Sequence, residues 1–413
     1  MRILSGAAAA ARVREMAARG SRYVEVEPTV RRVIADVRRR GDRALRKYAE
    51  KWDDLGRQES LQVSEPELRA AWKAVTPELR AALRTAAANI RRFCEWQKPI
   101  EWMRTRKGIT VGQIVRPLDS VGCYVPGGRY PLVSTLLMTV IPAQVAGVRN
   151  IRIFSPHPRS EVLAAAGMLG VGEVYRVGGV QAIAALAYGT QSIPRVDKIV
   201  GPGNLYVTAA KKLVSFDCAI DFLAGPTEVV IVSDAGIPEF IAADLVAQAE
   251  HDPEALAVLV TTRDDLARRA ARAVEKLSRG NAVARQSLLR NSVIFVSASR
   301  AQSFEWANKL AAEHLTVDAT DAALVRNAGS VFVGDYSPQA AGDYSSGPNH
   351  VLPTGGAARF RGGLSVLDFV KLISVQRLSR SGLKQIAPVV ESLANAEGLQ
   401  AHAESIRTRL DHA

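Results

Sequence analysis

The sequence is poor in cysteine. Only three occur among 413 residues, and their spacing forms neither a CxxC pair nor a disulfide framework: Cys94, Cys123 and Cys218. We expect each to be a small buried residue, which is the usual state of free cysteine, in a protein of a reducing compartment.

Long apolar runs are also absent. The best candidate, residues 133–148, is interrupted by a serine, two threonines, a proline and a glutamine, whereas a transmembrane helix needs about 20 apolar residues. Arg12 and Arg14 interrupt the alanine-rich start, so no signal peptide is expected. These absences predict a soluble, cytoplasmic protein that binds no membrane.

Positive charge is in excess, with 54 Lys and Arg against 41 Asp and Glu, a formal net charge of +13. The densest basic cluster spans residues 31–47, where Val30, Val33, Ile34 and Val37 recur at the spacing of one buried helix face. The arginines then form the solvated face. Nucleic-acid binding is the alternative, but no zinc finger, helix-turn-helix or RNA-binding signature accompanies it. A basic field also favours an anionic cofactor such as a dinucleotide.

The composition, 47% hydrophobic and 23% charged, excludes global disorder and favours about two to three globular domains. The first third should be helical, over 29–52 and again from Ser64 and Thr76. From residue 117 onward, β-rich and helical segments alternate, which is typical of parallel α/β sheets, and their number suggests two sheets. Strands are expected at 151–155, 173–177, 198–200, 228–233, 256–261, 292–296 and 330–333. Helices are expected at 160–169, 181–188, 205–214, 238–250, 263–278 and 299–312.

A segment rich in glycine and proline, residues 334–364, precedes two expected terminal helices at 383–395 and 401–410. A loop of this length inside a compact domain favours a functional role. Asp343 and His350 lie in it, where substrate or metal contacts and ordinary turn chemistry are both open.

Two further pairs of residues could carry chemistry. Gln248 and His251 share one face at the end of the expected helix 238–250, where His251 is either a helix-capping residue or a metal ligand. Because an amide is an uncommon zinc ligand, spacing alone does not nominate Gln248. Glu313 and His314 could address two different protons, and a surface pair is the alternative.

Three glycine-rich turns, at 126–128, 178–179 and 201–204, could each present backbone N–H groups to a phosphate. None fits the pattern GxGxxG. In the third turn, Gly201 and Gly203 match the first two glycines of the pattern, but Tyr206 stands where the last glycine or alanine is needed. Nicotinamide binding would therefore use a modified mode.

Together these segments resemble the histidinol dehydrogenase family over nearly the whole chain. The matching stretches follow in family order: 121–128, 175–187, 196–204, 224–228, 248–251, 313–315, 342–353 and 396–399 with His402. The resemblance implies an NAD-dependent enzyme of histidine biosynthesis that oxidises L-histidinol through L-histidinaldehyde to L-histidine. Such an enzyme uses two NAD⁺ per turnover and one zinc ion per subunit.

The resemblance also implies the roles of individual residues. Glu313 and His314 are the implied acid–base pair. The implied zinc ligands, which also contact substrate, are Gln248, His251, Asp343 and His402, with His402 supplied by the partner in a homodimer whose sites are shared. Further implied substrate contacts are Thr227, His314, His350 and Glu397. The implied NAD contacts are Tyr124, Gln181 and Asn204.

The expected fold is α/β, with two Rossmann-like parallel-sheet domains, modified dinucleotide binding, a helical N-terminal region and a small C-terminal helical tail. We expect the first domain to comprise residues 1–117 with 238–365, the second 118–237, and the tail 366–413. The zinc ion would anchor the imidazole and amine of histidinol. His314 would take the hydroxyl proton, and Glu313 would activate the water that the aldehyde must add.

Two alternatives stay open. A family-like enzyme could oxidise another alcohol such as a sulfonated diol, since Thr227 replaces a common serine and Arg129-Tyr130 is bulky after the glycine turn. His350, Glu397 and His402 favour histidinol. A basic non-enzymatic binding module would need neither zinc nor NAD, and it leaves the ordered motifs unexplained.

Overall fold

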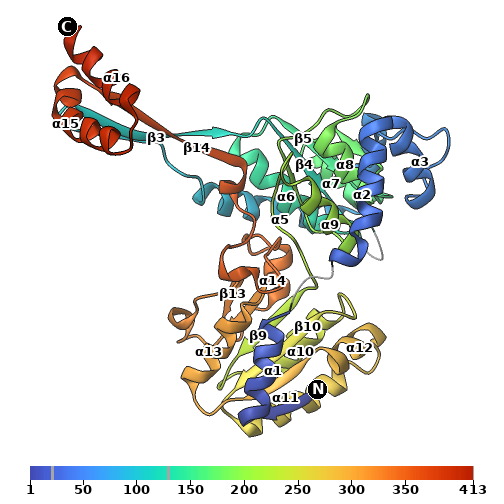
Figure 1. Ribbon diagram of the computed structural model, residues 1–413. Coiled ribbons are helices and arrows are strands. Elements are labelled where there is room, and N and C mark those ends of the chain that lie inside the picture. Colours follow the sequence, from blue (N-terminus) through green and yellow to red (C-terminus); the bar gives the residue numbers. More distant parts are fainter. Residues whose placement is uncertain (20–22, 128–130, 413) are drawn as a thin grey trace.

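Two parallel sheets, each covered by helices on both faces, form the body of the molecule (Figure 1). The computed structural model describes residues 1–19, 23–127 and 131–412. This confirms the predicted α/β class with two parallel sheets. Among the described residues, no helix is long and apolar enough to cross a membrane.

The first sheet has six strands. In spatial order they are β1 (Arg2–Ser5), β11 (Val293–Val296), β10 (Leu256–Thr261), β9 (Glu228–Val232), β12 (His314–Val317) and β13 (Ser330–Val333). One face packs on α1 (Gly6–Ala17) and α13 (Arg300–Leu310). The other packs on α10 (Pro238–Ala249), α11 (Asp264–Leu277) and α12 (Ala282–Arg290). Because both faces are covered, every residue of β9 and β10 is buried.

The second sheet has five strands. In spatial order they are β6 (Val174–Tyr175), β5 (Asn150–Phe154), β4 (Ser120–Tyr124), β7 (Lys198–Val200) and β8 (Ala219–Ile220). One face packs on α2 (Tyr23–Arg40), α3 (Asp42–Trp52), α8 (Gly179–Tyr188) and α9 (Leu205–Val214). The other packs on α4 (Glu65–Ala74), α5 (Pro77–Trp96), α6 (Val133–Ala146) and α7 (Ser160–Met168).

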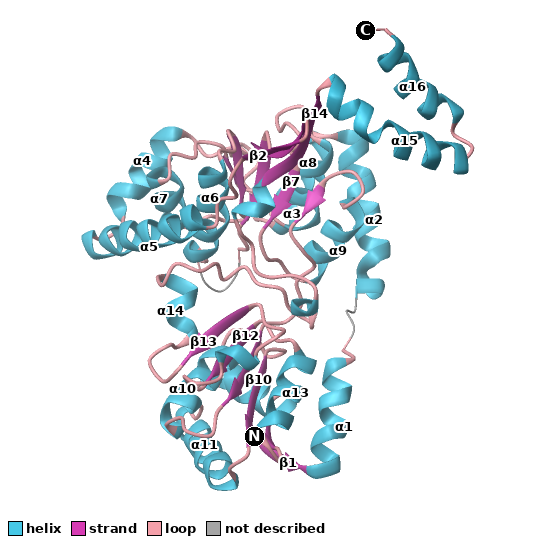
Figure 2. Ribbon diagram, turned by 90° about the vertical axis from the view of Figure 1, so that its left-hand side faces the viewer, coloured by secondary structure: helices cyan, strands magenta, loops and turns pink. Residues whose placement is uncertain are grey.

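An antiparallel arm projects from this body in both views (Figures 1 and 2). Strand β3 (Ile109–Pro117) pairs along its whole length with β14 (Val370–Leu378), and β2 (Trp102–Arg106) pairs with the other edge of β3. The arm carries α15 (Arg380–Ala396) and α16 (Gln400–Asp411), which pack on each other. The two predicted terminal helices are therefore confirmed, whereas the three strands of the arm were not predicted.

The chain is divided between the sheets differently from the predicted boundaries. Of residues 1–117, only β1 and α1 join the first sheet, whereas α2–α5 pack on helices of the second. The buried face of α2, which the periodicity predicted, lies against α8 and α9. Strand β9 also belongs to the first sheet, although it precedes the predicted boundary at 238. Periodicity shows which face of a helix is buried, but it does not identify the neighbour.

Several local predictions are confirmed. Val30, Val33, Ile34 and Val37 are buried, and all three cysteines are buried and free. Ser64 and Glu67 form the capping box that begins α4. The long segment 334–364 contains a short α-helix, α14 (Gln339–Tyr344), and a 3-10 turn at Ala357–Arg359. Its residues Val351 and Leu364 pack on the core of the second domain.

Candidate active site

Glu313 and His314 lie at the junction of β9 and β12, the neighbouring strands between which the order of the first sheet reverses. His314 is the first residue of β12 and pairs in register with Val229. Both side chains are buried, with 8% of Glu313 and 4% of His314 exposed. The sequence left open a surface pair, and burial excludes it.

The imidazole of His314 has two different environments. Nδ1 lies 3.3 Å from the carbonyl oxygen of Glu228. Since a carbonyl only accepts, Nδ1 carries the proton, and in the neutral ring Nε2 is the acceptor. Nε2 is buried without a hydrogen-bond partner and lies 3.5 Å from Oδ1 of Asp343. Burial disfavours the imidazolium, but the carboxylates of Glu313 and Asp343 outweigh it and raise the pKa of His314.

Hydrogen bonds fix one of the two carboxyl oxygens of Glu313. Its Oε2 accepts hydrogen bonds from the hydroxyl of Thr227 and, at 2.9 Å, from the backbone N–H of Glu228. Burial raises the pKa of Glu313 to about 7, although His314 and these donors oppose the rise. A carboxyl group with this pKa can exchange a proton near neutral pH.

Four other sequence-predicted residues lie beside this pair. Gln248, at the end of α10, donates its amide N–H to Thr227. Nδ1 of His350 lies 2.7 Å from the backbone oxygen of Asp343. Asp343 is part of α14. Burial opposes ionisation of Asp343, but His314 outweighs it and lowers the pKa of that carboxyl group.

A cavity of about 370 Å³ opens onto this group and is lined by His314, Asp343, His350 and Phe332, among others. The segment that carries His350 is tied to the second domain, because Asn349 donates to the carbonyl of Met138 at 2.6 Å. The cavity therefore lies where the first domain meets the second, a common position for a substrate site.

The remaining sequence-predicted ligands are exposed. His251 follows α10 and lies near enough to Asp343 to contribute to lowering the pKa of that residue. Glu397 and His402 lie on α15–α16 of the arm, away from the first sheet in both views (Figures 1 and 2). Within the described part of this single chain, no three His, Cys, Asp or Glu residues could together hold a metal ion.

The carboxyl edge of the first sheet is closed by its own side chains. Asp318 accepts hydrogen bonds from Ser233 and from the backbone of Asp234, and Arg300 contacts both aspartates. This edge is where an open α/β sheet usually binds a dinucleotide. Here the carboxylates would repel a pyrophosphate.

The carboxyl edge of the second sheet holds all three sequence-predicted NAD contacts. Tyr124 ends the central strand β4, and its hydroxyl accepts from the N–H of Gly179 at 3.1 Å. Gln181 is fully buried, and its Oε1 has no partner. Asn204 is exposed and caps α9, just after β7. The order of this sheet reverses between β4 and β7, so the three residues surround a topological switch point. Gly128, Arg129 and Tyr130 lie outside the described residues.

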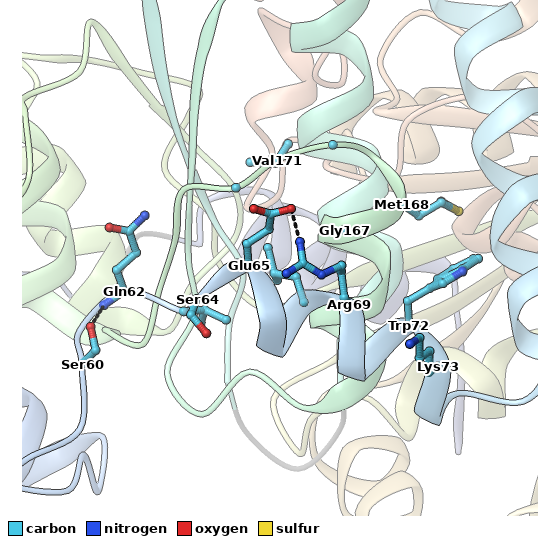
Figure 3. A pocket seen from close by; sticks show the side chains of 14 residues that line it. Ser60, Gln62, Ser64, Glu65, Arg69, Trp72, Lys73, Gly167, Met168 and Val171 are labelled. Carbon is cyan, nitrogen blue, oxygen red and sulfur yellow. Dashed lines mark hydrogen bonds and ion pairs between the residues drawn. The ribbon is translucent and has the colours of Figure 1, made fainter.

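A larger cavity, about 920 Å³, lies elsewhere on the second domain, between α4 and the end of α7 (Figure 3). Its wall carries Trp72 and an ion pair between Glu65 and Arg69, which point toward each other. None of the sequence-predicted site residues lines it. Size alone therefore does not mark the reactive site.

Sequence reasoning missed three buried acids that hold the predicted residues in place. Glu228 binds Glu313 and His314 through its backbone, and its carboxylate pairs with Arg19 at 2.6 Å. Asp53 accepts from Gly178 N–H and from Gln181, and Asp221 accepts from Gly201 N–H. No spacing rule marks such residues, because their partners are distant in sequence.

A buried acid–imidazole pair in one α/β domain, together with a topological switch point in the sheet of another, fits the class of two-domain α/β oxidoreductases. The family model described as histidinol dehydrogenase matches residues 17–410. A histidinol dehydrogenase of Methanothermobacter thermautotrophicus is 49% identical over 393 residues, covering 92% of each chain. One of Methanosarcina barkeri is 46% identical, covering 97% of this chain and 96% of the other.

A solved structure supports the same assignment. The crystal structure of histidinol dehydrogenase from Elizabethkingia anophelis superposes with a TM-score of 0.95 at 36% identity, covering 100% of this chain and 98% of that one. The chain belongs to the histidinol dehydrogenase family, and it is an NAD-dependent oxidoreductase.

Proposed function

We propose that this protein oxidises L-histidinol through L-histidinaldehyde to L-histidine, reducing two NAD⁺ in sequence. The observation that carries the proposal is the buried pair of Glu313 and His314, of which His314 lines a cavity together with Asp343 and His350. A four-electron oxidation needs two proton acceptors with different tasks, and this pair offers two.

His314 acts as the base for both hydride transfers. The carbonyl of Glu228 fixes the proton on Nδ1, so Nε2 faces the cavity as an acceptor. It accepts the hydroxyl proton of the alcohol while a hydride leaves to the first NAD⁺. It returns that proton to the aldehyde oxygen as water adds, and it then accepts a proton from the hydrate while the second hydride leaves to the second NAD⁺.

Glu313 acts between these steps. The aldehyde carries no hydroxyl hydrogen until water has added, and Glu313 removes the proton of the attacking water. Thr227 and the N–H of Glu228 occupy Oε2, so Oε1 is left for the water. The largely buried surroundings keep the reactive aldehyde from escaping between the two steps.

Gln248, His251 and Asp343, with His402 of the partner subunit, would hold one zinc ion. The amide nitrogen of Gln248 is engaged by Thr227, so its oxygen is the atom left as a metal donor. This mixed N/O set suits zinc. When bound, the metal supplies an anchor for the imidazole and amine of the substrate. His350, Glu397 and Thr227 complete the substrate contacts.

NAD⁺ binds at the carboxyl edge of the second sheet. Tyr124, Gln181 and Asn204 surround the switch point there, and the unpaired Oε1 of Gln181 is a buried acceptor for a polar group of the cofactor. A buried acceptor without a partner carries a free-energy cost, which a bound ligand relieves.

The active unit is a homodimer with shared sites. The arm exposes a set of apolar side chains: Val111, Leu372, Ile373, Val389 and Leu393. Val389 and Leu393 are 60% and 61% exposed. Clustered exposed apolar side chains of this kind often mark a protein–protein interface. A second copy of the chain would cover these side chains. In such a dimer, Glu397 and His402 of each subunit would reach the site that contains Glu313 and His314 of the other.

The test is the stoichiometry of the reaction. The purified protein, with zinc and excess NAD⁺, should form close to two NADH for each L-histidinol consumed, because alcohol to acid is a four-electron oxidation. One NADH per substrate would contradict the second step. Turnover of a sulfonated diol with none of histidinol would contradict the substrate.

A further inference from the structure

Lys211 and Asp221 form a fully buried ion pair beneath the turn that joins β7 to α9. The side chains are 2% and 0% exposed, and Nζ of Lys211 contacts Oδ1 of Asp221. Lys211 lies on α9, and Asp221 follows β8. Neither side chain touches the cavity that holds His314.

Both charges are also bonded to the backbone of a single residue, Gly201. Lys211 donates to the carbonyl oxygen of Gly201 at 3.0 Å, and Asp221 accepts from its N–H at 2.7 Å. The pair therefore fixes both peptide groups of that residue.

Gly201 occupies a demanding position. Its φ is +115°, and a Cβ atom there would clash with the backbone oxygen of Tyr124. The turn thus lies directly against the end of β4. It also sets the position of Asn204, which begins α9 three residues later.

Stability alone does not account for an ion pair at this depth. Removing two charges from water is costly, and apolar replacements of similar volume are often neutral or stabilising. An apolar pair could replace neither the two bonds to Gly201 nor the bond that Asp221 accepts from the N–H of Phe222. Arg361 further restrains Asp221 by donating to its backbone oxygen and lying over the ring of Phe222.

We propose that Lys211 and Asp221 are positioning residues for NAD⁺. They hold the Gly201 turn against Tyr124, so that Tyr124 and Asn204 meet the cofactor in fixed geometry. This inference rests on the proposed cofactor site at the second sheet. It predicts that loss of the pair weakens cofactor binding while the chemistry at Glu313 and His314 is retained.

The test replaces both charges together, in the double variant Lys211→Met/Asp221→Leu, so that no unpaired charge is left buried. We expect a melting temperature near that of the parent and an unchanged KM for histidinol. The Kd for NAD⁺, measured by titration, should rise about tenfold to hundredfold, the scale of a small misplacement of a binding group. The kcat at saturating NAD⁺ should stay within about threefold of the parent, because such a loss affects binding rather than the chemical step.

A folded double variant that binds NAD⁺ as tightly as the parent would overturn the proposal. If this variant does not fold, Lys211→Met/Asp221→Asn keeps an acceptor for the N–H of Gly201 and loses only the bond to its carbonyl. It should still bind NAD⁺ more weakly, and an unchanged Kd there would overturn the proposal equally.

Two control variants separate this inference from the cofactor site itself. Asn204→Ser keeps a residue that caps α9 and removes the amide, so its Kd for NAD⁺ should rise. If it does not, the proposed cofactor site is wrong. If Asn204→Ser weakens binding but the double variant does not, only the positioning role is wrong. Lys212→Met removes a charge on the same helix, α9, that pairs with Glu27 on α2 rather than with the turn, and its Kd for NAD⁺ should match the parent.

Discussion

The backbone of Glu228 holds the carboxyl group of Glu313: its N–H donates to Oε2 at 2.9 Å. Its carbonyl oxygen lies 3.3 Å from Nδ1 of His314. One residue of β9 thus orients both members of the acid–base pair, Glu313 just before β12 and His314 at its first position. Because the two bonds use different backbone atoms of Glu228, replacing one side chain leaves the bond to the other in place, so Glu313 and His314 can be varied separately.

The first prediction concerns the division of labour in this pair. Glu313→Gln should slow oxidation of the aldehyde about 10²–10⁴-fold, the usual cost of losing a positioned base, and oxidation of the alcohol much less. His314→Asn should slow both, because each hydride leaves from a carbon whose oxygen must lose a proton. Single-turnover NADH formation, with histidinol or histidinaldehyde supplied separately, measures each step. Equal slowing of both steps by Glu313→Gln would make the pair one coupled unit.

The second prediction concerns pH. Burial raises the pKa of Glu313 to about 7, and a base acts only when deprotonated. The rate of aldehyde oxidation should therefore rise with pH up to about 7 and level off above it, falling about tenfold per pH unit on the acid side. In Glu313→Gln the contribution of Glu313 should disappear from the residual aldehyde rate, and only the dependence that comes from His314 should remain. An identical pH profile in parent and variant would assign the titration to another group.

The third prediction concerns zinc. His251→Asn should lower zinc affinity at least about tenfold, since even groups that only orient metal ligands contribute that much. Zinc retained after dialysis, measured by atomic absorption, and turnover should fall together while the circular dichroism spectrum is unchanged. His157→Asn, at an exposed turn outside the site, is the matched control. Full zinc content in His251→Asn would remove His251 from the ligand set.

The fourth prediction concerns shared sites. His402→Ala and His251→Ala should each inactivate the protein, but subunit exchange between them should restore part of the activity. In a mixed dimer one site carries both lesions and the other carries neither. Heterodimers verified by mass that stay inactive would contradict the exchange of His402 between subunits.

Much of this structure was accessible from the sequence. The alternation of β-rich and helical segments predicted two parallel sheets. The spacing of Val30, Val33, Ile34 and Val37 predicted the buried face of α2. These features depend on local periodicity, which the chain carries within a few turns. The order of the motifs also indicated the family, and the comparisons confirmed it.

Tertiary structure decided what joins distant residues. Packing between segments far apart in the chain decides which sheet the helices α2–α5 cover. It also decides that β1 and β9 belong to the same sheet. The arm was missed because β2 is exposed at every residue and β14 is mostly exposed, so their strands lack the alternation that burial imposes.

The candidate site shows the same division. The sequence nominated Glu313 and His314 as chemical groups, but only the fold buries them and places the backbone of Glu228 against both. The raised pKa of Glu313 is a property of that burial and not of the residue type. Residue chemistry is local and can be read from the chain, whereas desolvation and hydrogen bonding arise only where separate strands meet.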